Sequence, residues 1–153
     1  MGETLLVTSV GTGDYDETTY VLEGTGEYTT NLFPLALANL LGVDSALVVR
    51  TPEAGEMYDD QLGNGFADLG VTYGTETIPK IEEQNDADAV LQTIFDAIGD
   101  GRFDPDSVVL DVTHAYRSLP MVFFASLMQL DALGVAAFEG IYYGEYQKDR
   151  ERS

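Results

Sequence analysis

Cysteine is absent from this chain of 153 residues, which excludes disulfides, thiolate-bound metals and cysteine nucleophiles. Long apolar runs are absent too: no stretch of about 18 apolar residues occurs, so we expect no membrane span and no membrane partner. The first residues lack a basic segment ahead of an apolar stretch, so no secretory signal is predicted either. We therefore expect a cytoplasmic protein.

Basic residues are scarce. The chain has 7 lysines and arginines against 27 aspartates and glutamates, which gives a formal net charge of −20. The acids are scattered over every segment, as is typical of the solvated surface of a halophilic protein; a DNA-mimicking decoy would concentrate them on one face. The mean field repels phosphates, so we expect no binding of duplex nucleic acid. In roughly 1 M salt the Debye length is about 3 Å, so distant carboxylates hardly weaken a local phosphate pocket.

Strand-like and helical patterns alternate along the chain. Continuous or alternating apolar runs predict strands over 4–10, 44–51, 71–78, 107–112 and 135–143. Apolar residues at helical spacing predict helices over 53–69 and 86–98. Two further helices are predicted, one that ends at about residue 41 and one that ends at about residue 133. A hairpin is expected over 18–29. This alternation predicts a single α/β domain, a three-layer sandwich with a mostly parallel central sheet.

Local signals place the ends of two helices. Thr30 or Asn31 is expected to cap the first helix, with Gly42 as its end. In the helix over 53–69, Gly63 and Gly65 are expected to weaken the helical pattern.

A glycine loop follows the first predicted strand. Ser9-Val-Gly-Thr-Gly13 offers backbone amides and two hydroxyls to a phosphate or a ribose. A tight turn that simply needs glycine explains the same pattern equally well. The loop lacks the third glycine of the dinucleotide fingerprint, and no P-loop pattern occurs, so we expect neither NAD nor a P-loop ATPase.

The run Val108-Val-Leu-Asp-Val-Thr-His-Ala-Tyr-Arg-Ser-Leu-Pro120 is predicted to be a strand, a loop and the start of a helix. It holds the only histidine, His114, three residues before Arg117. A cation and an imidazole at the carboxyl end of a strand indicate an anionic ligand. Ion pairing of both side chains to nearby carboxylates is the structural alternative. One histidine with Asp111 makes a poor metal-ligand set, so we expect no metal and no cofactor.

Together these segments resemble CARF domains, the CRISPR-associated Rossmann-like sensors of type III antiviral systems. The resemblance rests on the segment Leu110 to Pro120, on Gly11-Thr-Gly-Asp-Tyr15 and on Ile141-Tyr-Tyr-Gly144. Its most specific part is the pattern Asp-x-Thr-His-x-x-Arg-Ser. The resemblance covers residues 1–146 as one Rossmann-like domain and leaves 147–153 as a charged tail.

This resemblance implies a homodimer that binds a cyclic tetra- or hexa-adenylate across its two-fold axis. The residues that it implies as ligand contacts are Gly11, Thr12, Gly13, Thr113, His114, Arg117 and Ser118. If the chain also cleaves the ring without metal, we expect Arg117 to stabilise charge, His114 to move a proton, and Thr12 or Ser9 to orient the ribose. The alternatives are a sensor domain of a larger effector and a nucleotide-binding metabolic enzyme.

Overall fold

The computed structural model describes residues 3–11, 15, 17–22, 24–78, 92–93, 96–97, 103, 105–111, 128, 131–132, 134 and 137–142. Five of its strands form one sheet in the order β5-β4-β1-β6-β7, and every neighbouring pair is parallel. These strands are β1 (Thr4–Ser9), β4 (Ser45–Arg50), β5 (Thr72–Thr77), β6 (Ser107–Asp111) and β7 (Ala137–Tyr142). The predicted parallel sheet is confirmed.

The strand order reverses direction at β1. The chain first adds β4 and β5 on one side of β1, and later adds β6 and β7 on its other side. Val7 in the middle of β1 therefore pairs with Leu47 of β4 on one side and with Leu110 of β6 on the other. This arrangement makes the boundary between β1 and β6 the topological switch point of the sheet.

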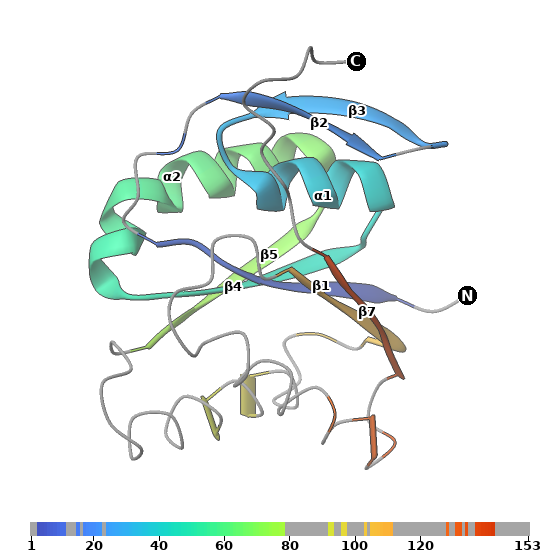
Figure 1. The fold of residues 1–153 in the computed structure, drawn as a ribbon. Coiled ribbons are helices and arrows are strands. Elements are labelled where there is room, and N and C mark those ends of the chain that lie inside the picture. Colours follow the sequence, from blue (N-terminus) through green and yellow to red (C-terminus); the bar gives the residue numbers. More distant parts are fainter. Residues whose placement is uncertain are drawn as a thin grey trace.

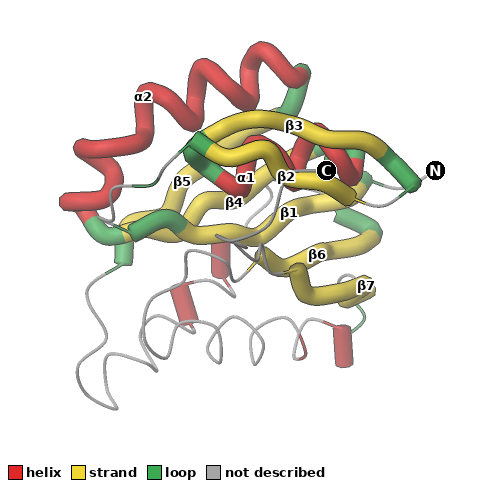
Figure 2. Tube along the Cα trace, turned by 45° about the horizontal axis from the view of Figure 1, so that its top comes forward, coloured by secondary structure: helices red, strands yellow, loops and turns green. Residues whose placement is uncertain are grey.

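Helical residues lie on both faces of the sheet. The helices α1 (Phe33–Leu41) and α2 (Pro52–Leu69) lie on one face, and the antiparallel hairpin of β2 (Thr18–Leu22) and β3 (Gly26–Thr30) lies over α1 (Figures 1 and 2). The helical residues at 92–93, 96–97, 128 and 131–132 lie on the opposite face (Figure 1). The predicted layered α/β fold is thus confirmed, and the hairpin adds a further layer outside α1.

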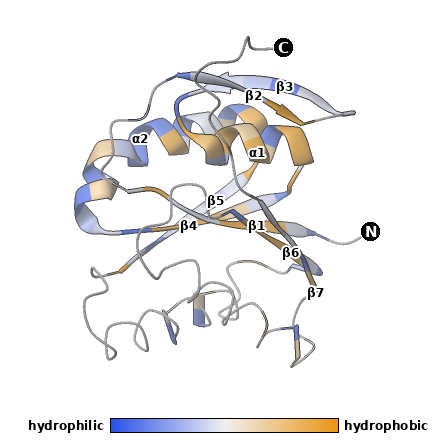
Figure 3. Cartoon of the chain, in the orientation of Figure 1, coloured by the Kyte–Doolittle hydropathy of each residue, from blue (hydrophilic) through white to orange (hydrophobic). Residues whose placement is uncertain are grey.

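The central strands are buried on both faces because their sequences are continuous apolar runs. Successive residues of a strand point to opposite faces of the sheet, so Leu6 and Val10 pack with α1 and α2, whereas Leu5 and Val7 point the other way. The two helices differ in exposure: α1 is largely apolar, whereas α2 alternates between hydrophilic and hydrophobic residues (Figure 3). No helix within the described ranges is long and apolar enough to cross a membrane.

The predicted cap of α1 is wrong. Neither Thr30 nor Asn31 is the N-cap, which is Leu32 with extended backbone and no side-chain cap. Thr30 is instead the last residue of β3, and its hydroxyl accepts a hydrogen bond from the Leu32 amide at 3.1 Å, ahead of the helix. The predicted end is confirmed, because Gly42 takes the left-handed conformation with φ of 67°.

Gly63 and Gly65 do not interrupt α2, which runs unbroken from Thr51, its N-cap, to Gly70. Gly65 lies where α1 packs against α2. A Cβ atom at this position would lie 2.6 Å from a methyl carbon of Leu35, so the glycine permits a close approach of the two helices. The residue that weakens the helical pattern in the sequence therefore allows the packing of the helix layer.

Candidate functional site

The two loops singled out in the sequence begin at adjacent strand ends. The glycine loop follows Ser9, the last residue of β1, and the segment with His114 and Arg117 follows Asp111, the last residue of β6. These two strands are parallel neighbours at the switch point of the sheet. Open α/β sheets bind ligands in the crevice outside the carboxyl ends of such strands. We therefore take the adjacent carboxyl ends of β1 and β6 as the candidate site.

A buried hydrogen bond joins the two strand ends below the loops. The Thr8 hydroxyl donates to Oδ2 of Asp111 at 2.7 Å, and neither side chain is exposed to solvent. Hydrogen bonds to a carboxylate are roughly twice as strong as those between neutral groups. The pair therefore fixes the end of β6 to the end of β1. The sequence singled out Asp111 but gave no sign of Thr8, because the two residues are 103 positions apart.

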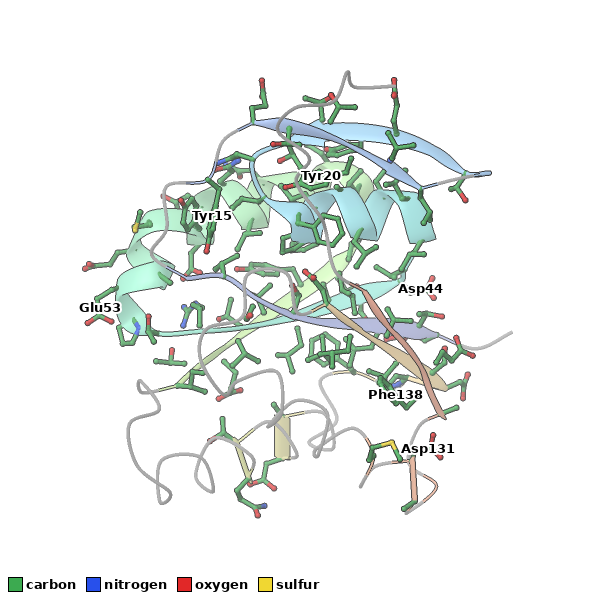
Figure 4. The ribbon with its side chains drawn as sticks, viewed as in Figure 1. Tyr15, Tyr20, Asp44, Glu53, Asp131 and Phe138 are labelled. Atoms are coloured by element: carbon green, nitrogen blue, oxygen red, sulfur yellow. The ribbon has the colours of Figure 1, made fainter. Side chains whose placement is uncertain are left out.

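The hairpin contributes a tyrosine close to this carboxylate. Tyr20 of β2 lies between the hairpin and α1, with its ring centroid 4.7 Å from that of Phe33 (Figure 4). Burial raises the pKa of Tyr20 above its ordinary value, and the negative charge of Asp111 raises it further, while a hydrogen bond with Thr18 opposes the shift. The Asp111 carboxylate therefore acts electrostatically on the face of the sheet that the hairpin and α1 cover.

Ser9 faces the opposite side of the sheet. Its hydroxyl is buried, with the residue only 1% exposed, and no partner within hydrogen-bond distance lies among the described residues. Buried hydroxyls nearly always have a partner, because leaving one unsatisfied costs about 1–3 kcal/mol. An unsatisfied hydroxyl at the carboxyl end of a central strand is a group that a bound ligand would satisfy.

The first amide of the glycine loop is already occupied. The Gly11 N–H donates to the phenolic oxygen of Tyr15 at 2.9 Å. The Tyr15 ring packs on that of Tyr58 in α2, with 5.4 Å between ring centroids, so Tyr15 lies between the loop and this helix (Figure 4). Tyr15 belongs to a segment on which the resemblance rests, but the resemblance does not imply this contact. The one feature of the sequence that could have indicated this hydrogen bond is a tyrosine four residues after the glycine.

The other predicted site residues lie outside the described residues. They are Thr12, Gly13, Thr113, His114, Arg117 and Ser118. Of the residues expected to contact the ligand, the structure therefore describes Ser9 and Gly11. Within this described part of the chain, no three acidic or histidine side chains lie close enough together to hold a metal ion.

A hollow lies at the carboxyl ends of β4 and β5, beside the start of α2. Its volume is about 460 Å³, and Arg50, Thr77 and several acidic residues of α2 line it. The Arg50 guanidinium donates two hydrogen bonds to Asp59, at 2.6 and 2.9 Å, and one to Thr77 at 2.6 Å. The Asp59 hydrogen bond raises the pKa of Arg50. Because Asp59 compensates the charge of Arg50, we do not expect Arg50 to bind an anionic ligand.

Comparison with models of protein families finds no match, and comparison with curated proteins finds none either.

Proposed function

We propose that the chain binds a cyclic oligoadenylate at the carboxyl ends of β1 and β6 and cleaves it without a metal ion. The observation that carries the proposal is the adjacency of these two strands at the switch point. Because of this adjacency, the two loops begin side by side. Two independent sequence patterns indicate that each of these loops can contact phosphate. The glycine loop alone would be a weak signal.

Recognition of the phosphates combines neutral donors with positive charge. Loop amides and the buried Ser9 hydroxyl donate hydrogen bonds, and Arg117 and His114 supply charge from the loop that follows β6. A cyclic ring has one charge per phosphate and internal symmetry. An isologous homodimer matches that symmetry by presenting both loops twice. The ligand would therefore lie across the two-fold axis of the dimer.

Cleavage requires no group beyond the ring and the protein. A ribose 2′-hydroxyl attacks its own 3′-phosphate, the bond to the 5′-oxygen of the next nucleotide breaks, and a 2′,3′-cyclic phosphate and a 5′-hydroxyl result. The attacking hydroxyl loses a proton, and the departing 5′-oxygen gains one. A histidine has an ordinary pKa near 6.5, so His114 is suited to this proton transfer. Arg117 and the amides stabilise the charge of the phosphorane, while Thr12 or Ser9 orients the ribose.

The test is incubation of the protein with cyclic tetra- and hexa-adenylate in EDTA, followed by chromatography of the products. We expect linear products that end in a 2′,3′-cyclic phosphate. His114→Ala should retain much of the binding but slow cleavage by roughly 10²–10⁴-fold, the usual worth of a general acid or base. A ligand that is bound but stays intact with stoichiometric protein would refute the nuclease and leave a sensor domain.

Arg117 is tested by binding. Arg117→Ala should lower the affinity for the ring by more than the ~1 kcal/mol of an exposed ion pair, without changing the melting temperature. Arg102→Ala, which removes the same charge outside both loops, is the matched control. If Arg117→Ala unfolds while its folded fraction binds normally, Arg117 is a structural ion-pair partner instead.

A further inference from the structure

The Tyr15 hydroxyl accepts a hydrogen bond from Gly11, one of the amides expected to contact the ligand. An amide N–H carries one proton, and the proton of Gly11 is directed at the phenolic oxygen of Tyr15 at 2.9 Å. A phosphate oxygen that accepts from Gly11 must therefore take the place of this hydroxyl. If both oxygens stayed beside the nitrogen they would have to share one proton, which weakens each hydrogen bond.

The exchange favours an anionic oxygen over the phenol. Hydrogen bonds to a charged acceptor are roughly twice as strong as those between neutral groups. A neutral ligand oxygen gains no such advantage over the tyrosine. The Gly11 amide is thus satisfied in the free protein and becomes available to ligands that carry negative charge.

The ring of Tyr15 does not depend on this hydrogen bond for its position. It packs on Tyr58, which is 6% exposed in α2, and belongs to the partly buried aromatic residues that pack against the core. Removal of the hydroxyl alone therefore leaves the ring contact in place while it frees the amide. This separates the hydrogen bond from the packing.

We propose that the Tyr15 hydroxyl occupies the place of a ligand phosphate oxygen at Gly11, and that binding exchanges one for the other. Tyr15 then sets the affinity of the site and its preference for anions. The inference rests on the proposed function in one respect, namely that Gly11 is a ligand contact. It needs neither ring cleavage nor a particular ring size.

The amide of Gly11 can be observed alone. Val10-Gly11 is the only Val-Gly pair in the sequence, so protein labelled with carbonyl-¹³C valine and ¹⁵N glycine gives a single amide signal in a spectrum that selects linked labels. The wild type, Tyr15→Phe and a control, Tyr28→Phe, are titrated with inorganic phosphate and with cyclic tetra- and hexa-adenylate. Tyr28 is a partly buried tyrosine of β3, so its variant removes the same hydroxyl elsewhere.

We expect the Gly11 signal to shift on titration of the wild type. Tyr15→Phe should bind each probe about two- to tenfold more tightly, which is the effect of one neutral hydrogen bond that no longer has to be broken. Its Gly11 amide should also exchange with solvent faster in the free protein. Tyr28→Phe should match the wild type in both measurements.

The outcomes separate this inference from the proposed function. If phosphate shifts Gly11 and binds Tyr15→Phe more tightly while neither ring binds, the exchange holds and the cyclic ligand is wrong. If Tyr15→Phe binds the probes more weakly or equally, Tyr15 is not a competitor and the inference is overturned. A Gly11 signal that stays fixed with every probe overturns it as well.

Discussion

Removal of the Thr8 hydroxyl tests whether the pair below the site stabilises the switch point. Thr8→Val keeps the size and branching of the side chain but removes the hydroxyl that donates to Oδ2 of Asp111 at 2.7 Å. Both residues are fully buried, so water does not replace the lost bond without a change of structure. A hydrogen bond to a charged group contributes about 1.5–3 kcal/mol to stability. We expect Thr8→Val to lower the free energy of unfolding by that amount.

The assay is denaturant unfolding at neutral pH in high salt, supported by thermal melts. In a domain of this size each 1 kcal/mol lowers the melting temperature by roughly 2–4 °C, so the shift should be about 3–12 °C. Thr8→Ser is the matched control, because it retains the donor and loses one methyl group, worth about 1 kcal/mol. If Thr8→Val is no less stable than Thr8→Ser, the hydrogen bond is not what holds the two strand ends, and the reasoning is refuted.

Two further predictions concern the packing around α2. Gly65→Ala should be about 1–3 kcal/mol less stable than Gly63→Ala in denaturant unfolding, because its Cβ would lie 2.6 Å from Leu35, whereas that of Gly63 would meet Tyr73 at 3.7 Å; equal stabilities would contradict the close approach of the helices. Burial, together with the charge of Asp59, raises the pKa of Tyr73 to about 12 from 10.0. As the pH rises from 10 toward 12 the unfolded state therefore loses this proton first, so stability falls, and Tyr73→Phe should lose less stability over that range. An identical decline in both proteins would count against a raised pKa.

The sequence predicted the sheet well because its strands are strongly patterned. The runs predicted over 4–10 and 107–112 correspond to β1 (Thr4–Ser9) and β6 (Ser107–Asp111), each within one residue at either end. Continuous apolar runs of this length are typical of parallel strands with both faces covered. Alternation with helices then predicts a parallel sheet, and a short strand-to-strand connection with glycines predicts the hairpin.

Contacts between distant segments were not predictable in the same way. Glycine lowers helix propensity wherever it stands, so nothing local distinguishes Gly65, which is needed at a helix crossing, from a residue that ends a helix. The cap of α1 was wrong because Thr30 is a good capping residue by type yet belongs to a strand. Likewise, the residue types do not predict that the Tyr15 hydroxyl accepts a hydrogen bond from the Gly11 amide.

The candidate site was predictable only as two separate loops. Patterns near Ser9 and after Asp111 indicated phosphate contacts, but no local signal places β1 beside β6. That adjacency comes from the strand order, in which four other strands separate the two along the chain but none separates them in the sheet. The pairing of Arg50 with Asp59 was missed because it depends on how the start of α2 packs beside the end of β4.

Titration calorimetry of a cyclic oligoadenylate into the protein, in high salt with EDTA, tests the central claim most directly. Tetra- and hexa-adenylate are measured separately, because the sequence does not determine the ring size. If the carboxyl ends of β1 and β6 form a shared anion site across a two-fold axis, one ring binds per two chains and EDTA has no effect. Absence of binding by either ring, loss of binding in EDTA, or one ring for each chain would contradict this account.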